Sequence, residues 1–134
     1  MFRRTPETVD LEQVQLFDGL SHRQLSTLAR LSTTVEVPAG RVIAQQGDAG
    51  AEFFMLLDGN VDVLRQGEVI ASRGPGAHLG EIALLAARPR TATIVTTTPV
   101  RARVASQREF TSMLAAVPEL SERLHATMAA RLAA

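Results

Sequence analysis

The chain has 134 residues, of which 46% are hydrophobic and 21% charged, and its 14 basic residues balance its 14 acidic ones. This length predicts one compact domain over residues 1–134 with a core of its own. The absence of cysteine excludes disulfides, thiolate catalysis and cysteine-bound zinc.

Charge and hydropathy exclude further classes. The balanced charge, and an aromatic content of 4% without Trp or Tyr, argue against direct nucleic-acid binding, which depends on clustered positive charge. The longest apolar runs, 53–57 and 82–87, fall far short of the roughly 20 residues of a membrane helix. A polar stretch follows Arg3 and Arg4 where an export signal has its apolar region, so we expect no signal peptide, no membrane association and a cytoplasmic location.

The first elements expected are two short helices between residues 10 and 32. Apolar residues recur there every three or four positions, which is the spacing of one buried helical face. The break is expected at Asp18-Gly19-Leu20, and Ser21 with Gln24 forms a capping box for the second helix.

Strands are expected from about residue 33 to 105. Short runs rich in Val, Ile, Thr and Phe end at Gly, Pro, Asn or Asp. Asp58-Gly59-Asn60 and Gln66-Gly67 are tight turns and predict antiparallel hairpins. The seven predicted strands are 34–37, 42–45, 53–57, 61–65, 69–72, 91–97 and 100–104. This number of strands favours a barrel or a sandwich.

Helices are expected to interrupt and to follow the strands. Residues 80–86 are strong helix formers with an acid at their start. A capping box of Ser106 and Glu109 starts a helix, and Pro118 opens the last one, so that helices fill 106–133. An apolar stripe with steps of four must pack on something: it consists of Leu120, Leu124, Met128 and Leu132.

The residues that point to chemistry lie between positions 79 and 94. A glycine opens the short helix, so the free backbone N–H groups of 80–83 and the helix dipole favour an anion. Arg90 offers two phosphate oxygens a bidentate partner, and the amides of Thr91 and Ala92 lie beside it. Glu81 is suited to accept a hydrogen bond from a sugar hydroxyl. The combination predicts a site for a phosphorylated sugar.

Two motifs give the chain a resemblance to the cyclic nucleotide-binding domain family. The family's phosphate-binding cassette is present as Gly80-Glu81-Ile82-Ala83-Leu84 followed by Arg90-Thr91-Ala92-Thr93-Ile94. Its earlier signature is present as Gly47-Asp48-Ala49-Gly50, Phe53-Phe54-Met55-Leu56 and Gly59. Ala44 departs from the pattern, where a bulkier residue or Cys is usual. The resemblance extends from about Leu16 to the C-terminus.

The resemblance implies an α+β, mainly β fold. This is an antiparallel β-roll, a jelly-roll-like barrel, with N-terminal helices, a short phosphate-binding helix between strands and two C-terminal helices. It implies a 3′,5′-cyclic nucleotide ligand, with cyclic AMP favoured and cyclic GMP the other possibility. Thr91 stands where members that accept cyclic GMP often carry threonine, which does not decide between the two.

The resemblance also implies a role for each site residue. Arg90 is expected to pair with the cyclic phosphate and Glu81 with the ribose 2′-hydroxyl, while Gly80, Ile82, Ala83 and Ala92 contribute backbone N–H groups. The apolar contacts expected for the base are Val61, Ile70 and Ala71. In this family the last helix often closes over the base as a lid, for which the candidates are Leu124, His125 and Met128.

Two functional hypotheses remain beside each other. The first is a stand-alone sensor in which the ligand reorders the C-terminal helices, and the second is a ligand-independent interaction module with the same fold. A protein partner or a homodimer through the C-terminal helices fits either one. We expect no enzyme, since no nucleophile and base form a pair, and neither cofactor nor metal, since His22, His78 and His125 are far apart. His78 is expected to be a partly buried structural residue.

Overall fold

The computed structural model describes residues 6–133, and the Arg3 and Arg4 pair considered above lies outside them. The helices at the N-terminal end are α1 (Pro6–Glu12), the 3₁₀ helix η1 (Gln15–Phe17) and α2 (His22–Arg30). The prediction of one continuous helix from residue 10 to the break at 18–20 is wrong. The α-helix begins earlier, where Pro6 suits the first helical position, and the chain tightens into η1 before the turn at Gly19. The capping box of Ser21 and Gln24 is confirmed at the start of α2.

Eight strands lie in the described part of the chain. They are β1 (Thr33–Val37), β2 (Val42–Ala44), β3 (Glu52–Asp58), β4 (Val61–Arg65), β5 (Glu68–Arg73), β6 (His78–Leu79), β7 (Thr93–Thr96) and β8 (Val100–Ser106). All seven predicted strands are present, with ends that differ by at most two residues. The strand β6 was missed because two residues are too short to show any alternation.

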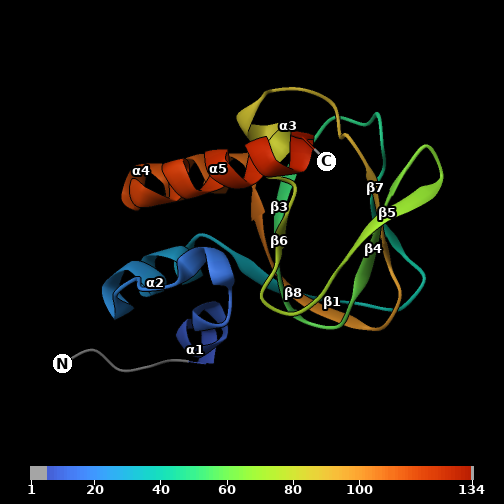
Figure 1. Ribbon diagram of the computed structural model, residues 1–134. Helices are drawn as coiled ribbons and strands as arrows, with labels where there is room; N and C mark the ends of the chain where they lie inside the picture. The colour runs from blue at the N-terminus through green and yellow to red at the C-terminus, as the bar shows by residue number, and fades with distance from the viewer. Residues whose placement is uncertain (1–5, 134) are drawn as a thin grey trace.

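The strands form two four-stranded antiparallel sheets that face each other as a roll (Figure 1). Their orders are β1-β8-β3-β6 and β2-β7-β4-β5. The tight turns predicted at Gly59 and Gly67 connect β3 to β4 and β4 to β5, and both glycines have positive φ. This arrangement confirms the predicted antiparallel β-roll.

The strand β3 separates two hydrophobic clusters. Its burial does not alternate, because residues 53–57 are all buried. Phe53 and Met55 point to the helices, where they pack with the buried residues of α2, α4 and α5, whereas Phe54 and Leu56 point into the roll. A strand that is covered on both faces needs apolar residues on both, which explains the unbroken run in the sequence.

The C-terminal helices α4 (Gln107–Ala116) and α5 (Glu119–Ala133) cover one side of the roll. The predicted capping box of Ser106 and Glu109 is confirmed. The apolar stripe packs only in the first half of α5: Leu120 and Leu124 are each 1% exposed, while Leu132 is 43% exposed. The second half of α5 runs on past the core toward α3 (Glu81–Leu85), as Figure 1 shows.

No helix among residues 6–133 has the length and apolar content needed to cross a membrane.

Candidate ligand-binding site

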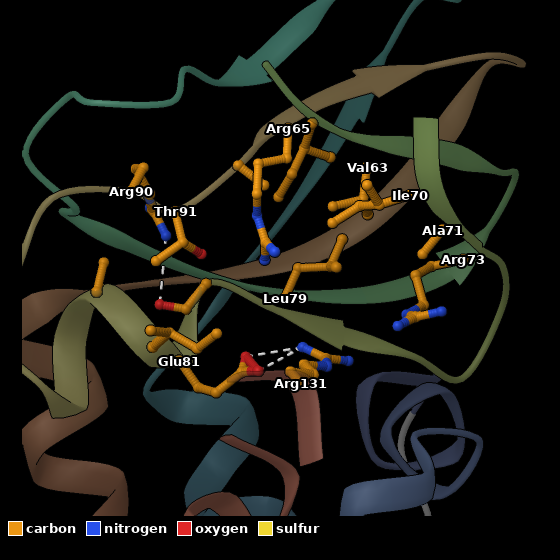
Figure 2. A pocket seen from close by; sticks show the side chains of 15 residues that line it. Val63, Arg65, Ile70, Ala71, Arg73, Leu79, Glu81, Arg90, Thr91 and Arg131 are labelled. Carbon is orange, nitrogen blue, oxygen red and sulfur yellow. Dashed lines mark hydrogen bonds and ion pairs between the residues drawn. The ribbon is translucent and has the colours of Figure 1, made fainter. Parts of the chain in front are cut away.

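A cavity of about 210 Å³ opens between α3, the end of α5 and the sheet that contains β4 and β5 (Figure 2). All the residues predicted for the phosphate and the ribose line it: Gly80, Glu81, Ile82, Ala83, Arg90, Thr91 and Ala92. The structure therefore brings into one place residues that the sequence separates into two segments, 80–83 and 90–92.

Gly80 positions the cassette through a backbone conformation that favours glycine. It is the N-cap of α3 with φ of 97°, in the left-handed region. A Cβ on this residue would lie 2.6 Å from Nη1 of Arg90 and 2.7 Å from the backbone oxygen of Glu52. Glycine is thus required both by the turn into α3 and by the close approach of Arg90.

Two backbone carbonyls of the chain hold the Arg90 side chain. Its Nη2 donates to the backbone oxygen of Glu52 at 2.7 Å and its Nη1 to that of Gly80 at 3.2 Å, and the guanidinium lies 5.8 Å from the centre of the Phe54 ring. Burial lowers the pKa of Arg90, while Glu52 and Glu81 oppose this effect. The two carbonyls orient a buried cation whose remaining donors are suited to an anion.

The earlier signature at 47–50 packs directly against the phosphate-binding cassette and forms backbone hydrogen bonds with it. The Arg90 amide donates to the backbone oxygen of Asp48 at 2.8 Å, and the Gly47 amide donates to that of Arg90 at 2.9 Å. A Cβ on Gly50 would lie 2.2 Å from the Cβ of Ala83, so only glycine allows this approach. The two motifs belong together because they form one structural unit.

Glu81 is fully buried and is bound by Arg131 of α5. Nη1 of Arg131 donates to both carboxylate oxygens, at 2.9 Å to Oε2, and its Nη2 donates to the backbone oxygen of His78 at 2.8 Å. Burial raises the pKa of Glu81, and the charge of Arg131 opposes that shift. Glu81, the residue predicted to bind the ribose, therefore already has an ion-pair partner within the chain.

The sequence analysis missed Arg131, although a signal for it was present. Arg131 lies seven positions after Leu124, so both side chains are on the same face of α5. Arg131 lies on the same face of α5 as the buried Leu120 and Leu124. A charged residue on the packed face of a helix is expected to have an acidic partner in the neighbouring element. Only the path of α5 toward α3 shows that this acid is Glu81.

His78 forms part of the wall beside Glu81. It is 7% exposed, its ring centroid lies 5.8 Å from that of Phe53, and its Nε2 lies 3.9 Å from Oε1 of Glu81. Among the described residues, Nε2 has no hydrogen-bond partner. Burial, followed by the charges of Arg131 and Arg73, lowers the pKa of His78 to about 3, so the ring is neutral at pH 7.

The other two histidines lie elsewhere, His22 half-buried at the start of α2 and His125 exposed on α5. Nε2 of His22 is 3.8 Å from Oε1 of Glu12, and Nδ1 of His125 is 2.6 Å from the backbone oxygen of Ser121. Within residues 6–133, no three His, Cys, Asp or Glu side chains are grouped closely enough to hold a metal ion.

The predicted base pocket is partly corrected by the structure. Ile70 and Ala71 line the cavity, and a register shift in β5 brings these neighbours to it together. Val61 does not line the cavity, because it is 0% exposed in the core of the roll. Val63, two residues further along β4 and on the same face, lines the cavity in its place.

The predicted lid residues do not reach the cavity in this arrangement. Leu124 is buried in the helical core, His125 is exposed, and Met128 is half-buried without lining the cavity. The reason is that α5 packs the face with Leu120 and Leu124 against α4 and η1 in the helical core. The side chain that α5 contributes to the cavity is Arg131.

The fold and the site together define a β-roll with a cavity for a small organic anion. A buried arginine fixed by backbone carbonyls and a buried carboxylate face the same space, and apolar side chains of the opposite sheet complete its walls.

Comparison with known proteins identifies the class. The cyclic nucleotide-binding domain family matches residues 34–117. The chain is 34% identical over 107 residues to the Pycsar effector protein XpPycTIR of Xanthomonas perforans, a match that covers 79% of this chain and 35% of the relative. It is 31% identical over 123 residues to a cAMP-dependent protein kinase regulatory subunit of Aspergillus niger, covering 90% of this chain and 30% of the relative.

The catabolite activator protein of Thermus thermophilus has a similar structure, with a TM-score of 0.79, 26% identity, and coverage of 87% of this chain and 57% of that one. The chain belongs to the cyclic nucleotide-binding domain family. It spans about a third of the length of the curated relatives it matches.

Proposed function

We propose that this chain binds a 3′,5′-cyclic nucleotide in the cavity and acts as a regulatory module rather than as an enzyme. The observation that carries the proposal is the pair of buried charged side chains on one cavity: Arg90 is 8% exposed and Glu81 is 0% exposed. A buried arginine whose cavity side is open is suited to a cyclic phosphate, and a carboxylate next to it is suited to a ribose hydroxyl.

Arg131 gives the proposal a mechanism for signalling. A ribose 2′-hydroxyl needs an oxygen of Glu81, and Arg131 now bonds to both oxygens. The ligand must therefore share or displace this ion pair, which changes the contact between α3 and the end of α5. A change in that contact is expected to reorder the C-terminal helices, through which a protein partner or a second copy is proposed to read the signal.

Calorimetric titration of the nucleotide-stripped protein tests binding. Cyclic AMP, which the resemblance favours, and cyclic GMP are the ligands to titrate first. We expect saturable binding of at least one, and a loss of affinity of about a hundredfold or more in Arg90→Ala, because the phosphate then lacks its charged partner. Arg90→Lys keeps the charge without the bidentate geometry, and it is expected to bind with intermediate affinity.

Arg88→Ala is the matched control. Arg88 is exposed, lies two residues before Arg90 and does not line the cavity. Its variant is expected to keep the affinity within about twofold, since an exposed charge outside the cavity adds little. Equal affinities in the Arg88 and Arg90 variants, or no binding by folded, empty wild-type protein, would overturn the proposal.

Hydrogen exchange tests the coupling separately from binding. We expect the amides at the end of α5 to change protection when the ligand saturates the protein, because the contact of Arg131 changes there. Identical protection of 119–133 with and without bound ligand would overturn the reordering and leave the binding intact.

One observation favours the alternative, a ligand-independent interaction module. Arg131 forms an ion pair with Glu81 within the chain, so the carboxylate on the cavity wall has a partner of its own. An absence of binding by wild-type protein, together with an unchanged fold in Arg90→Lys, is the result expected for that module.

A further inference from the structure

The wall of the cavity opposite the cassette carries a cation of its own. Val61, Val63 and Arg65 are two residues apart along β4, so their side chains share one face of the strand. That face points into the roll, and Figure 2 shows the Arg65 side chain extending from the upper wall into the cavity toward Leu79 and Glu81. Arg65 is half-buried there.

Arg65 has no partner in the part of the chain that the structure describes. No hydrogen bond, ion pair or ring contact involves its side chain, and Glu68, its neighbour across the hairpin, makes no ion pair with it. The other three arginines of the cavity are engaged. Arg73 donates to the backbone oxygen of Ser72 at 3.3 Å, Arg90 is held by two carbonyls, and Arg131 is bound to Glu81.

The side chains that line the cavity therefore carry an excess of positive charge. Glu81 is the one acid among the residues that line it, against four arginines, and this acid is already paired. The five N–H groups of a guanidinium only donate hydrogen bonds. Arg65 thus offers hydrogen-bond donors on the wall of the cavity, where acceptor atoms of a ligand could bind.

The proposed function fixes which part of the ligand reaches Arg65. With the phosphate at Arg90 and the ribose at Glu81, the base extends toward the wall formed by Val63, Ile70 and Ala71, beside Arg65. Guanine presents two adjacent acceptors, O6 and N7, which match the fork of an arginine. Adenine presents N7 beside an amino group, and this amino group would face the donors of the guanidinium.

We propose that Arg65 makes this cavity selective for a cyclic nucleotide whose purine base carries a carbonyl oxygen at position 6, as guanine does, over cyclic AMP. The inference rests on the proposed function and deepens it. It replaces the preference for cyclic AMP that the resemblance implied, because the deciding residue lies outside both family motifs.

Cyclic IMP and cyclic AMP form the decisive pair of ligands, since they differ mainly in an oxygen or an amino group at position 6. We expect the wild-type chain to bind cyclic IMP at least about tenfold more tightly, in keeping with one bidentate contact to a base. Cyclic GMP carries the same O6 and N7 pair as cyclic IMP, and it is expected to share the preference.

Variants assign the preference to Arg65. Arg65→Leu is expected to bring the ratio of the two affinities to within about twofold, and Arg65→Lys to reduce it, since an ammonium lacks the fork. Arg73→Leu removes the same charge from the same cavity, and it is expected to weaken both ligands alike and keep the ratio. Arg108→Leu, on an exposed position of α4, controls for the loss of an arginine from the surface.

The two proposals fail in different ways. Wild-type protein that binds cyclic AMP as tightly as cyclic IMP, or an unchanged ratio in Arg65→Leu, overturns the base preference and leaves cyclic nucleotide binding intact. A lack of binding by any cyclic nucleotide overturns both.

Discussion

Acidification is expected to destabilise this protein through His78, a neutral histidine in the wall of the cavity. Its pKa falls from 6.5 to about 3 on folding, chiefly because burial disfavours the charged ring. Between these two values the unfolded chain binds a proton that the folded chain does not. The contribution of His78 to stability is therefore complete above pH 6.5 and is lost as the pH falls toward 3.

The surroundings of the ring determine the size of this effect. Arg131 of α5 and Arg73 of β5 disfavour a charge on the ring, while Glu81 of α3, 3.9 Å away, favours it, and Phe53 packs on one side. For a single group with these two pKa values, the free energy of unfolding falls by about 2 kcal/mol between pH 7 and pH 5.

His78→Phe isolates this contribution. The Phe ring keeps the packing on Phe53. The substitution removes no hydrogen bond of Nε2, because this atom has no partner among the described residues. Burial also raises the pKa of Glu81, and the contribution of Glu81 to stability has the opposite sign, because it is lost as the pH rises. Because Glu81 is present in both proteins, the difference between them reports on His78.

Denaturant unfolding at pH 7 and pH 5 is the assay. We expect wild-type protein to lose about 2 kcal/mol more than His78→Phe between the two pH values, and the variant to be at least as stable as wild type at pH 5. An equal loss in the two proteins would show that His78 is protonated in the folded state, contrary to the reasoning from burial.

Three further substitutions test the packing around the site by the same denaturant assay. Gly80→Ala is expected to destabilise the protein by about 1–3 kcal/mol and to weaken cyclic nucleotide binding, because the added Cβ meets a backbone oxygen 2.7 Å away at a positive φ; unchanged stability and affinity would contradict this. Phe110→Ala removes a ring 4.9 Å from that of Phe53, and it is expected to cost about 3–5 kcal/mol. Ser106→Ala removes one half of a capping box, and a loss of about 1 kcal/mol is expected; a loss as large as that of Phe110→Ala would point to a role beyond capping.

The sequence by itself determined the elements whose signals are local. Both capping boxes are satisfied within four residues, so Ser21 and Ser106 mark helix starts whatever the rest of the chain does. Turn glycines and β-branched runs located seven strands, and the spacing of Gly80, Glu81 and Arg90 located the cassette.

Only the tertiary structure decided which side chains complete the cavity. The part of a strand that borders a cavity depends on how the two sheets and α5 are placed, which is why Val63 and Arg65 line the cavity while Val61, on the same face of β4, lies in the core. The contact between Arg131 and Glu81 joins residues 50 positions apart, and it follows from the path of α5. Local sequence patterns do not predict this contact, because it depends on how the hydrophobic core positions α5 relative to the β-roll.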